Sequence, residues 1–151
     1  MTRFTEGMRS SLSDEWTTPR DLFDELDAEF HFDLDVASTD LNALCERHYT
    51  KDDDGLSQKW YGSVWCNPPY GRAIGAWMEK AATSNSGGVT VCLVPARTDT
   101  RWWHAWVVGH ATEVRFVRGR LKFGDSGSSA PFPSAVVIYD RRESRYWKVK
   151  P

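Results

Sequence analysis

The chain has 151 residues, of which 40% are hydrophobic and 26% are charged, a composition typical of one soluble globular domain. No apolar run is long enough to cross a bilayer, and the first residues lack the apolar stretch of a secretory signal, so we expect a cytoplasmic protein with no membrane partner. Three cysteines, an odd number at no metal-binding spacing, favour free thiols over a disulfide framework.

The net charge of −2 conceals an uneven distribution of charged residues. Residues 1–96 carry 8 basic and 16 acidic side chains, whereas residues 97–151 carry 11 basic and 5 acidic ones. A basic C-terminal third is typical of a surface that binds a polyanion such as nucleic acid. An unevenly charged surface that only faces solvent has the same composition, so charge alone leaves both interpretations open.

The beginning of the chain predicts a tail followed by a helix. Residues 1–14 are polar and predict a flexible tail, so the folded domain spans residues 15–151. Thr18 is placed to cap a helix that has Pro19 at its first position. Apolar residues at helical spacing then continue to Phe30, where we expect the helix to end.

Beyond this helix, strands and helices alternate. The predicted strands span residues 32–37, 63–66, 89–94, 113–117, 134–139 and 146–149, the last two as an antiparallel pair. Apolar residues at helical spacing predict helices over residues 38–45, 74–81 and 100–107. Turn-forming residues predict loops over residues 47–59 and 124–133. This alternation predicts an α/β fold with one mostly parallel sheet and an antiparallel C-terminal edge.

The most informative stretch is Asn67-Pro68-Pro69-Tyr70, which follows the buried strand predicted over residues 63–66. Two consecutive prolines cannot donate to a sheet ladder, so the chain must leave the sheet here in an extended form. In open α/β sheets, ligands bind at the carboxyl ends of the strands. The sequence therefore predicts a ligand site at this corner.

The corner offers groups that suit a planar heterocycle with an exocyclic amino group. The Asn67 side-chain carbonyl and the Pro68 backbone carbonyl can each accept one hydrogen of such an amino group, and the Tyr70 ring can stack on a base. Two acceptors would draw the nitrogen toward a pyramidal geometry and free its lone pair to attack an electrophilic methyl group. A plain strand exit with a buried tyrosine is the alternative interpretation.

The corner resembles the catalytic [Asp/Asn/Ser]-Pro-Pro-[Tyr/Phe] motif of amino-methyltransferases that use S-adenosylmethionine. More specifically, residues 14–139 resemble the small phage-encoded DNA N6-adenine methyltransferase family. The similarity consists of six blocks in order, at residues 15–19, 34–37, 54–56, 65–71, 95–100 and 118–123 with 130–134. The resemblance implies a Rossmann-like methyltransferase domain, S-adenosylmethionine as cofactor, double-stranded DNA as partner, no metal, and the cytoplasm of a host cell as location.

The resemblance also implies roles for individual residues. The catalytic residues that hold a flipped adenine would be Asn67, Pro68, Pro69 and Tyr70. The residues that bind the cofactor would be Trp16, Thr17, Thr18, Pro19, Asp35 and Asp54. From the sequence alone, the threonines could equally cap a helix, Asp35 could face outward from a strand, and Asp54 could belong to a solvated loop.

Basic residues in the C-terminal third are candidates for contacts with DNA phosphates or bases. These residues are Arg97, Arg101, Arg118, Arg120 and Lys122. A solvated loop is the alternative for each of them.

The chain departs from the methyltransferase pattern in its first half. Residues 37–39 read Ala-Ser-Thr where many methyltransferases carry a glycine-rich turn. Only about thirty residues separate Asp35 from Asn67, which predicts that one or two strands of the full fold are missing and that the cofactor-binding half is abbreviated.

Two other functions remain compatible with the sequence. The same tetrapeptide serves enzymes that methylate glutamine side chains of proteins, although a protein substrate gives no reason for the basic C-terminal third. A non-catalytic DNA-binding derivative of the fold would be consistent with the abbreviated cofactor half. Cytosine-C5 methylation is disfavoured because no cysteine directly follows a proline, and a metal site is disfavoured because the spacing of cysteines and histidines supports none.

Overall fold

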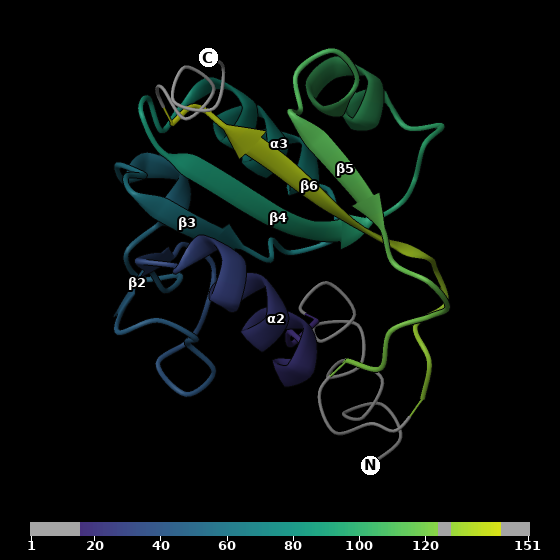
Figure 1. Cartoon of the computed structure of the whole chain (residues 1–151), viewed down its shortest axis with the longest axis horizontal. Helices are drawn as coiled ribbons and strands as arrows, with labels where there is room; N and C mark the ends of the chain where they lie inside the picture. Colours follow the sequence, from purple (N-terminus) through teal and green to yellow (C-terminus); the bar gives the residue numbers. More distant parts are fainter. Residues whose placement is uncertain (1–15, 124–127, 143–151) are drawn as a thin grey trace, which may run out of the picture.

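The computed structural model describes residues 16–123 and 128–142. Within these residues, six strands form one sheet in the order β2-β1-β3-β4-β6-β5 (Figure 1). The strands are β1 (Leu34–Asp35), β2 (Arg47–His48), β3 (Ser63–Cys66), β4 (Val89–Pro95), β5 (Glu113–Phe116) and β6 (Ser134–Asp140). Neighbouring strands from β2 to β4 are parallel, and β6 is antiparallel to both β4 and β5. The predicted α/β fold with a mostly parallel sheet is confirmed.

Helical segments cover both faces of the sheet. The two α-helices are α2 (Arg20–Phe30) and α3 (Ile74–Thr83), and the shorter segments are the 3-10 turn η1 (Gly55–Ser57) and the π-helical turn η2 (Trp103–Val107). Successive side chains of a strand point to opposite faces, so β3 and β4 supply two cores. Val64 and Val94 pack on the side of α3 and η2, whereas Trp65, Val91 and Leu93 pack on the side of α2.

The central strand shows why the apolar run in the sequence was informative. Every residue of β4 is buried, and β4 lies between the parallel strand β3 and the antiparallel strand β6. A strand that is buried on both faces reads as a continuous apolar run rather than as an alternation. The predicted bounds of β3, and the residues that α3 buries, also agree with the structure.

The first helix ends at Phe30 as predicted, but it begins differently. Its first helical residue is Arg20, Pro19 occupies the N-cap position, and no side chain caps the helix. The prediction that Thr18 caps this helix is therefore wrong. The Thr18 hydroxyl instead accepts a hydrogen bond from Asn67.

The predicted helix over residues 38–45 is also wrong, because this segment forms turns. The backbone N–H of Leu44 donates to the Asp35 carboxylate at 3.1 Å, and Thr39 and Asn42 bond to each other through backbone and side chain. These bonds to side chains replace the helical pattern of bonds to carbonyl oxygens. Leu41, one of the apolar residues of the predicted helix, is fully exposed.

One further prediction of local structure is corrected. The predicted loop over residues 47–59 contains β2 and η1, each only two or three residues long. In the described residues β6 pairs with β4 and β5, and the predicted partner strand over residues 146–149 lies outside them. Residues 143–151 lie outside the described part of the chain, as does the predicted tail.

Candidate active site

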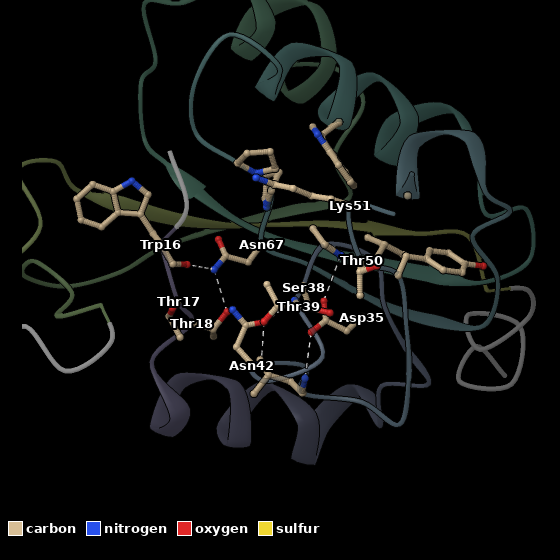
Figure 2. A pocket seen from close by; sticks show the side chains of 18 of the residues that line it. Trp16, Thr17, Thr18, Asp35, Ser38, Thr39, Asn42, Thr50, Lys51 and Asn67 are labelled. Atoms are coloured by element: carbon tan, nitrogen blue, oxygen red, sulfur yellow. Dashed lines mark hydrogen bonds between the residues drawn. The ribbon is translucent and has the colours of Figure 1, made fainter. Parts of the chain in front are cut away.

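A pocket with a volume of about 200 Å³ opens at the carboxyl ends of the parallel strands (Figure 2). Its walls come from the residues before α2, from the end of β1, from the residues that follow β1, β2 and β3, and from Trp77 of α3. The pocket includes eight of the predicted site residues: Trp16, Thr17, Thr18, Asp35, Asp54, Asn67, Pro68 and Pro69. The fold therefore brings the predicted cofactor residues and the predicted catalytic corner into one pocket; Pro19 and Tyr70 lie outside its lining.

The Asn67 side chain is held in one orientation by the segment that precedes α2. Its Nδ2 donates one hydrogen bond to the backbone carbonyl of Trp16 and a second to Thr18 Oγ1 at 2.9 Å (Figure 2). A backbone carbonyl can only accept, so the nitrogen and not the oxygen of the amide must face Trp16. Both hydrogens of the amide are thus used within the protein.

The other end of the same amide is unsatisfied. Asn67 Oδ1 is buried and has no hydrogen-bond partner. Leaving a buried acceptor unpaired costs about 1–3 kcal/mol, which a donor on a bound ligand would recover. The geometry therefore presents a ready hydrogen-bond acceptor at the start of the Pro68-Pro69 corner.

Tyr70 is fixed at both ends of its side chain. Its hydroxyl donates to the Leu93 carbonyl at 2.9 Å, and its ring lies among Trp16, Phe123 and Phe132 with centroids 5.6 to 6.4 Å away. Burial raises the pKa of the Tyr70 hydroxyl well above its ordinary value, so the group stays a neutral donor. We refer to Trp16, Tyr70, Phe123 and Phe132 as the aromatic cluster; it borders the pocket through Trp16.

Asp35 is a buried carboxylate at the end of β1. Only 2% of its surface is exposed, and its two oxygens accept hydrogen bonds from the backbone N–H groups of Ala37 at 3.3 Å and Leu44 at 3.1 Å. Burial raises the pKa of Asp35, and the two N–H donors oppose this shift. The alternative that Asp35 faces outward from its strand is therefore wrong.

Gly55 brings the segment after β2 close to the first strand. A Cβ atom at this position would overlap with the Val36 carbonyl oxygen and would lie 3.0 Å from Cη2 of Trp77. Only glycine permits this close approach. Asp54, the exposed residue just before Gly55, lines the same pocket as Asp35.

Several pocket residues were not predicted from the sequence. They lie in the turn after β1 and in the segment after β2: Ser38, Thr39, Asn42, Thr50 and Lys51 (Figure 2). The buried Oγ of Ser38 has no hydrogen-bond partner, which makes it a second unsatisfied group in this pocket. Their positions directly after strands could have indicated a ligand site. For Thr50 and Lys51 this signal was hidden, because β2 has only two residues and therefore no hydrophobic pattern from which a strand could be predicted.

The predicted DNA-contacting residues lie in two exposed segments. Arg97 follows β4 and stacks 5.6 Å from the centroid of Phe132, and Arg120 donates to the Ala130 carbonyl at 3.3 Å. Both are therefore placed next to the aromatic cluster. Three further basic residues are exposed in the same segments: Arg101, Arg118 and Lys122.

Within residues 16–123 and 128–142, no group of three or more His, Cys, Asp or Glu side chains is arranged to hold a metal ion. In the same part of the chain, no helix is both long enough and apolar enough to cross a membrane.

A family model and a curated relative give the same family for this chain. The family model for DNA N-6-adenine-methyltransferases (Dam) matches residues 6–142. A DNA N-6-adenine-methyltransferase of Escherichia phage T1 is 32% identical over 162 aligned positions, which cover 93% of this chain and 67% of the relative. A presumed RNA methyltransferase of known structure from Pyrococcus horikoshii aligns with a TM-score of 0.46 and 13% identity, over 63% of this chain and half of that one.

Proposed function

Because the chain belongs to the DNA N-6-adenine-methyltransferase (Dam) family, we propose that it transfers a methyl group from S-adenosylmethionine to the N6 amino group of adenine in double-stranded DNA. The family predicted from the six sequence blocks is thus confirmed, and with it an adenine-specific methyltransferase. The observation that carries the detailed proposal is the unsatisfied Asn67 Oδ1 beside a pocket built from the predicted cofactor residues.

The chemistry of the pocket fits S-adenosylmethionine, which combines charged, polar and flat apolar groups. Asp35 and Asp54 provide acceptors for hydroxyl or amino groups, and Lys51 provides a cation at the rim. Val36 and Trp77 contribute apolar parts of the pocket lining. When bound, this cofactor supplies the electrophilic methyl group that the proposed reaction needs.

The residues of the corner then act on the target amino group. Asn67 Oδ1 and the Pro68 carbonyl accept its two hydrogens, which localises the lone pair on the nitrogen. This stabilises the transition state more than the ground state, because the amino group is planar before the reaction and pyramidal during it. No proton needs to be removed before the attack, so the attack itself requires no general base; the methylated nitrogen would then carry a positive charge and release one proton to water.

The aromatic cluster and the basic residues would receive the DNA. An adenine inside a duplex is out of reach of the corner, so the base must be flipped out of the stack. The Tyr70 ring, whose position is fixed by the Leu93 carbonyl, offers a face for the flipped base. Arg97 and Arg120, beside this cluster, would contact phosphates, which set affinity and orientation rather than sequence preference.

The proposal is tested by incubating the protein with radiolabelled S-adenosylmethionine and unmethylated duplex DNA, followed by digestion to nucleosides. We expect the label in N6-methyladenosine. Label that appears only in added protein substrates would favour glutamine methylation instead. DNA retention without any label would favour a non-catalytic DNA-binding derivative.

A second prediction follows from the raised pKa of Asp35. Only the ionised carboxylate is a strong acceptor, so cofactor affinity should fall as the pH decreases from neutrality toward 3.8, the ordinary pKa of aspartate, and the fall should begin at a higher pH than an unshifted aspartate would cause. Stability responds in the opposite sense. Because the folded-state pKa is above the unfolded one, the contribution of this group to stability declines as the pH rises through that interval.

Isothermal titration calorimetry across this pH range measures the affinity, with Asp35→Asn as the matched control. The variant cannot ionise at this position, so its weaker affinity should vary less with pH. His48, whose pKa is raised by its hydrogen bond to Asp40, titrates in both proteins, and its charge lowers the pKa of Asp35 in the wild type only. Identical pH profiles for the two proteins would contradict a cofactor contact by Asp35.

A further inference from the structure

We infer that Thr18 is a positioning residue, which, together with the Trp16 carbonyl, orients the Asn67 amide so that Oδ1 is available to the target amino group. This inference rests on the proposed function and adds to it a group that acts through Asn67. The segment of residues 16–18 thus has a role in catalysis besides lining the cofactor pocket.

The hydrogen bonds of the amide carry the inference. An asparagine amide can present either its oxygen or its nitrogen to a ligand, and only the oxygen can accept from an amino group. In this structure the two hydrogens of Nδ2 are taken by the Trp16 carbonyl and by Thr18 Oγ1. Rotation of the amide by half a turn would place Oδ1 against the Trp16 carbonyl, two acceptors facing each other. The wrong orientation is therefore disfavoured before any substrate binds.

The Thr18 hydroxyl bonds to the Asn67 amide and does not cap the helix that it precedes. Threonine before a helix commonly caps it, yet α2 has no side-chain cap and Pro19 stands at its N-cap position. Thr18 Oγ1 lies 2.9 Å from Asn67 Nδ2 although 49 residues separate the two in the chain. The segment is anchored on both sides, by α2 and by the Trp16 ring, which packs against Phe123 and Phe132 with centroids 5.3 and 5.2 Å away.

The same geometry explains the choice of asparagine at position 67. The resemblance allows aspartate, asparagine or serine at the first position of the motif. An ionised aspartate here would have no hydrogen to give to the Trp16 carbonyl and would oppose it with a negative oxygen. In this chain, the acceptors that the residues before α2 present to position 67 therefore suit an asparagine amide and not an ionised aspartate.

The first experiment compares Thr18→Val with Thr18→Ser in steady-state methylation of duplex DNA. Valine keeps the shape and removes the acceptor, so we expect kcat to fall about tenfold, the effect of losing one hydrogen bond in the transition state. Because Thr18 also lines the pocket, cofactor affinity is measured by calorimetry for each variant, and kcat is compared at saturating cofactor so that a change in binding does not enter it. Serine restores the hydroxyl and should recover most of kcat. Equal kcat values for valine and serine variants would overturn the inference.

The second experiment uses Asn67→Asp and its dependence on pH. A protonated carboxyl can donate to the Trp16 carbonyl and still present an acceptor, so the activity of this variant relative to the wild type should rise as the pH falls. Other titratable groups near this position are Asp35, Lys51 and Asp54 in the pocket, and Cys66 and Tyr70 on either side of the corner. They are shared by both proteins, so the ratio isolates residue 67. A ratio that stays constant or falls would overturn the inference.

A third measurement does not depend on activity. In ¹⁵N-correlated NMR spectra, the Asn67 side-chain amide can be assigned by its absence from Asn67→Ala. We expect both of its protons to exchange slowly in the wild type and in Thr18→Ser, and one of them to exchange much faster in Thr18→Val. Unchanged exchange in the valine variant would refute the hydrogen bond. An inactive wild type with the expected NMR pattern would instead refute the proposed function and leave the orientation of the amide established.

Discussion

Replacing Asn67 with alanine should lower kcat for methylation by about 10²- to 10³-fold or more, the range seen when one preorganised hydrogen-bonding group is removed from a transition state. The substitution deletes Oδ1, the buried acceptor without a partner in the protein. Nothing else in the pocket replaces it, because the nearby Thr18 hydroxyl and Trp16 carbonyl are directed at the lost amide. Single-turnover methylation with saturating cofactor and DNA measures the chemical step directly.

The control for this variant is the binding of the cofactor. Asp35, Asp54 and the walls formed by Val36 and Trp77 are untouched, so the dissociation constant of S-adenosylmethionine should stay within about threefold of the wild type. The melting temperature should be recorded as well, since the Trp16 carbonyl loses a buried partner. An Asn67→Ala protein with near wild-type turnover would contradict the proposed mechanism.

The second large effect is expected for Gly55→Ala. The added methyl group would overlap with the Val36 carbonyl oxygen and press on the Trp77 ring. The residue cannot easily move, because its carbonyl accepts a hydrogen bond from Trp60 Nε1 at 2.9 Å. We expect a loss of about 1–3 kcal/mol in the free energy of unfolding, as for overpacked interiors. The displaced wall should also weaken cofactor binding at least about tenfold, which corresponds to a loss of about 1.4 kcal/mol in binding free energy.

Gly75→Ala is the matched control for this prediction. Gly75 lies within α3, and a Cβ atom there would meet only Trp102 Cβ at 3.6 Å, an ordinary contact. Alanine is a better helix former than glycine by about 1 kcal/mol, so this variant should be as stable as the wild type or more stable. Urea unfolding and calorimetry compare the two variants. Similar behaviour of both would show that the approach of Gly55 to Val36 does not shape the pocket.

The structure of the corner at residues 67–70 could be predicted from the sequence because its determinants are local. Pro68 and Pro69 end a strand by their own covalent geometry, and the apolar run of residues 63–66 needs no partner to be recognised. The same holds for β4. All seven of its residues are buried, and a strand that is buried on both faces is recognised by its continuous apolar run. The end of α2 at Phe30 likewise follows from a helical repeat within the helix itself.

The half of the chain that is proposed to bind the cofactor was harder to predict because its structure depends on distant partners. β1 and β2 have two residues each, too few for a periodic pattern. Residues 38–45 have helical spacing, but the Asp35 carboxylate takes the N–H of Leu44 and the turns form instead. Local propensity was overridden there by a bond across nine residues.

The sequence by itself determined the family, the α/β class, the strand that ends at Asn67 and the chemical types gathered at that corner. Only the tertiary structure decided how the Asn67 amide is oriented, that Asp35 is buried, and that Thr18 serves Asn67 rather than its own helix. The reason is physical. Motifs follow from covalent geometry and short-range periodicity, whereas the direction of an amide depends on which donors and acceptors the fold brings to it from elsewhere in the chain.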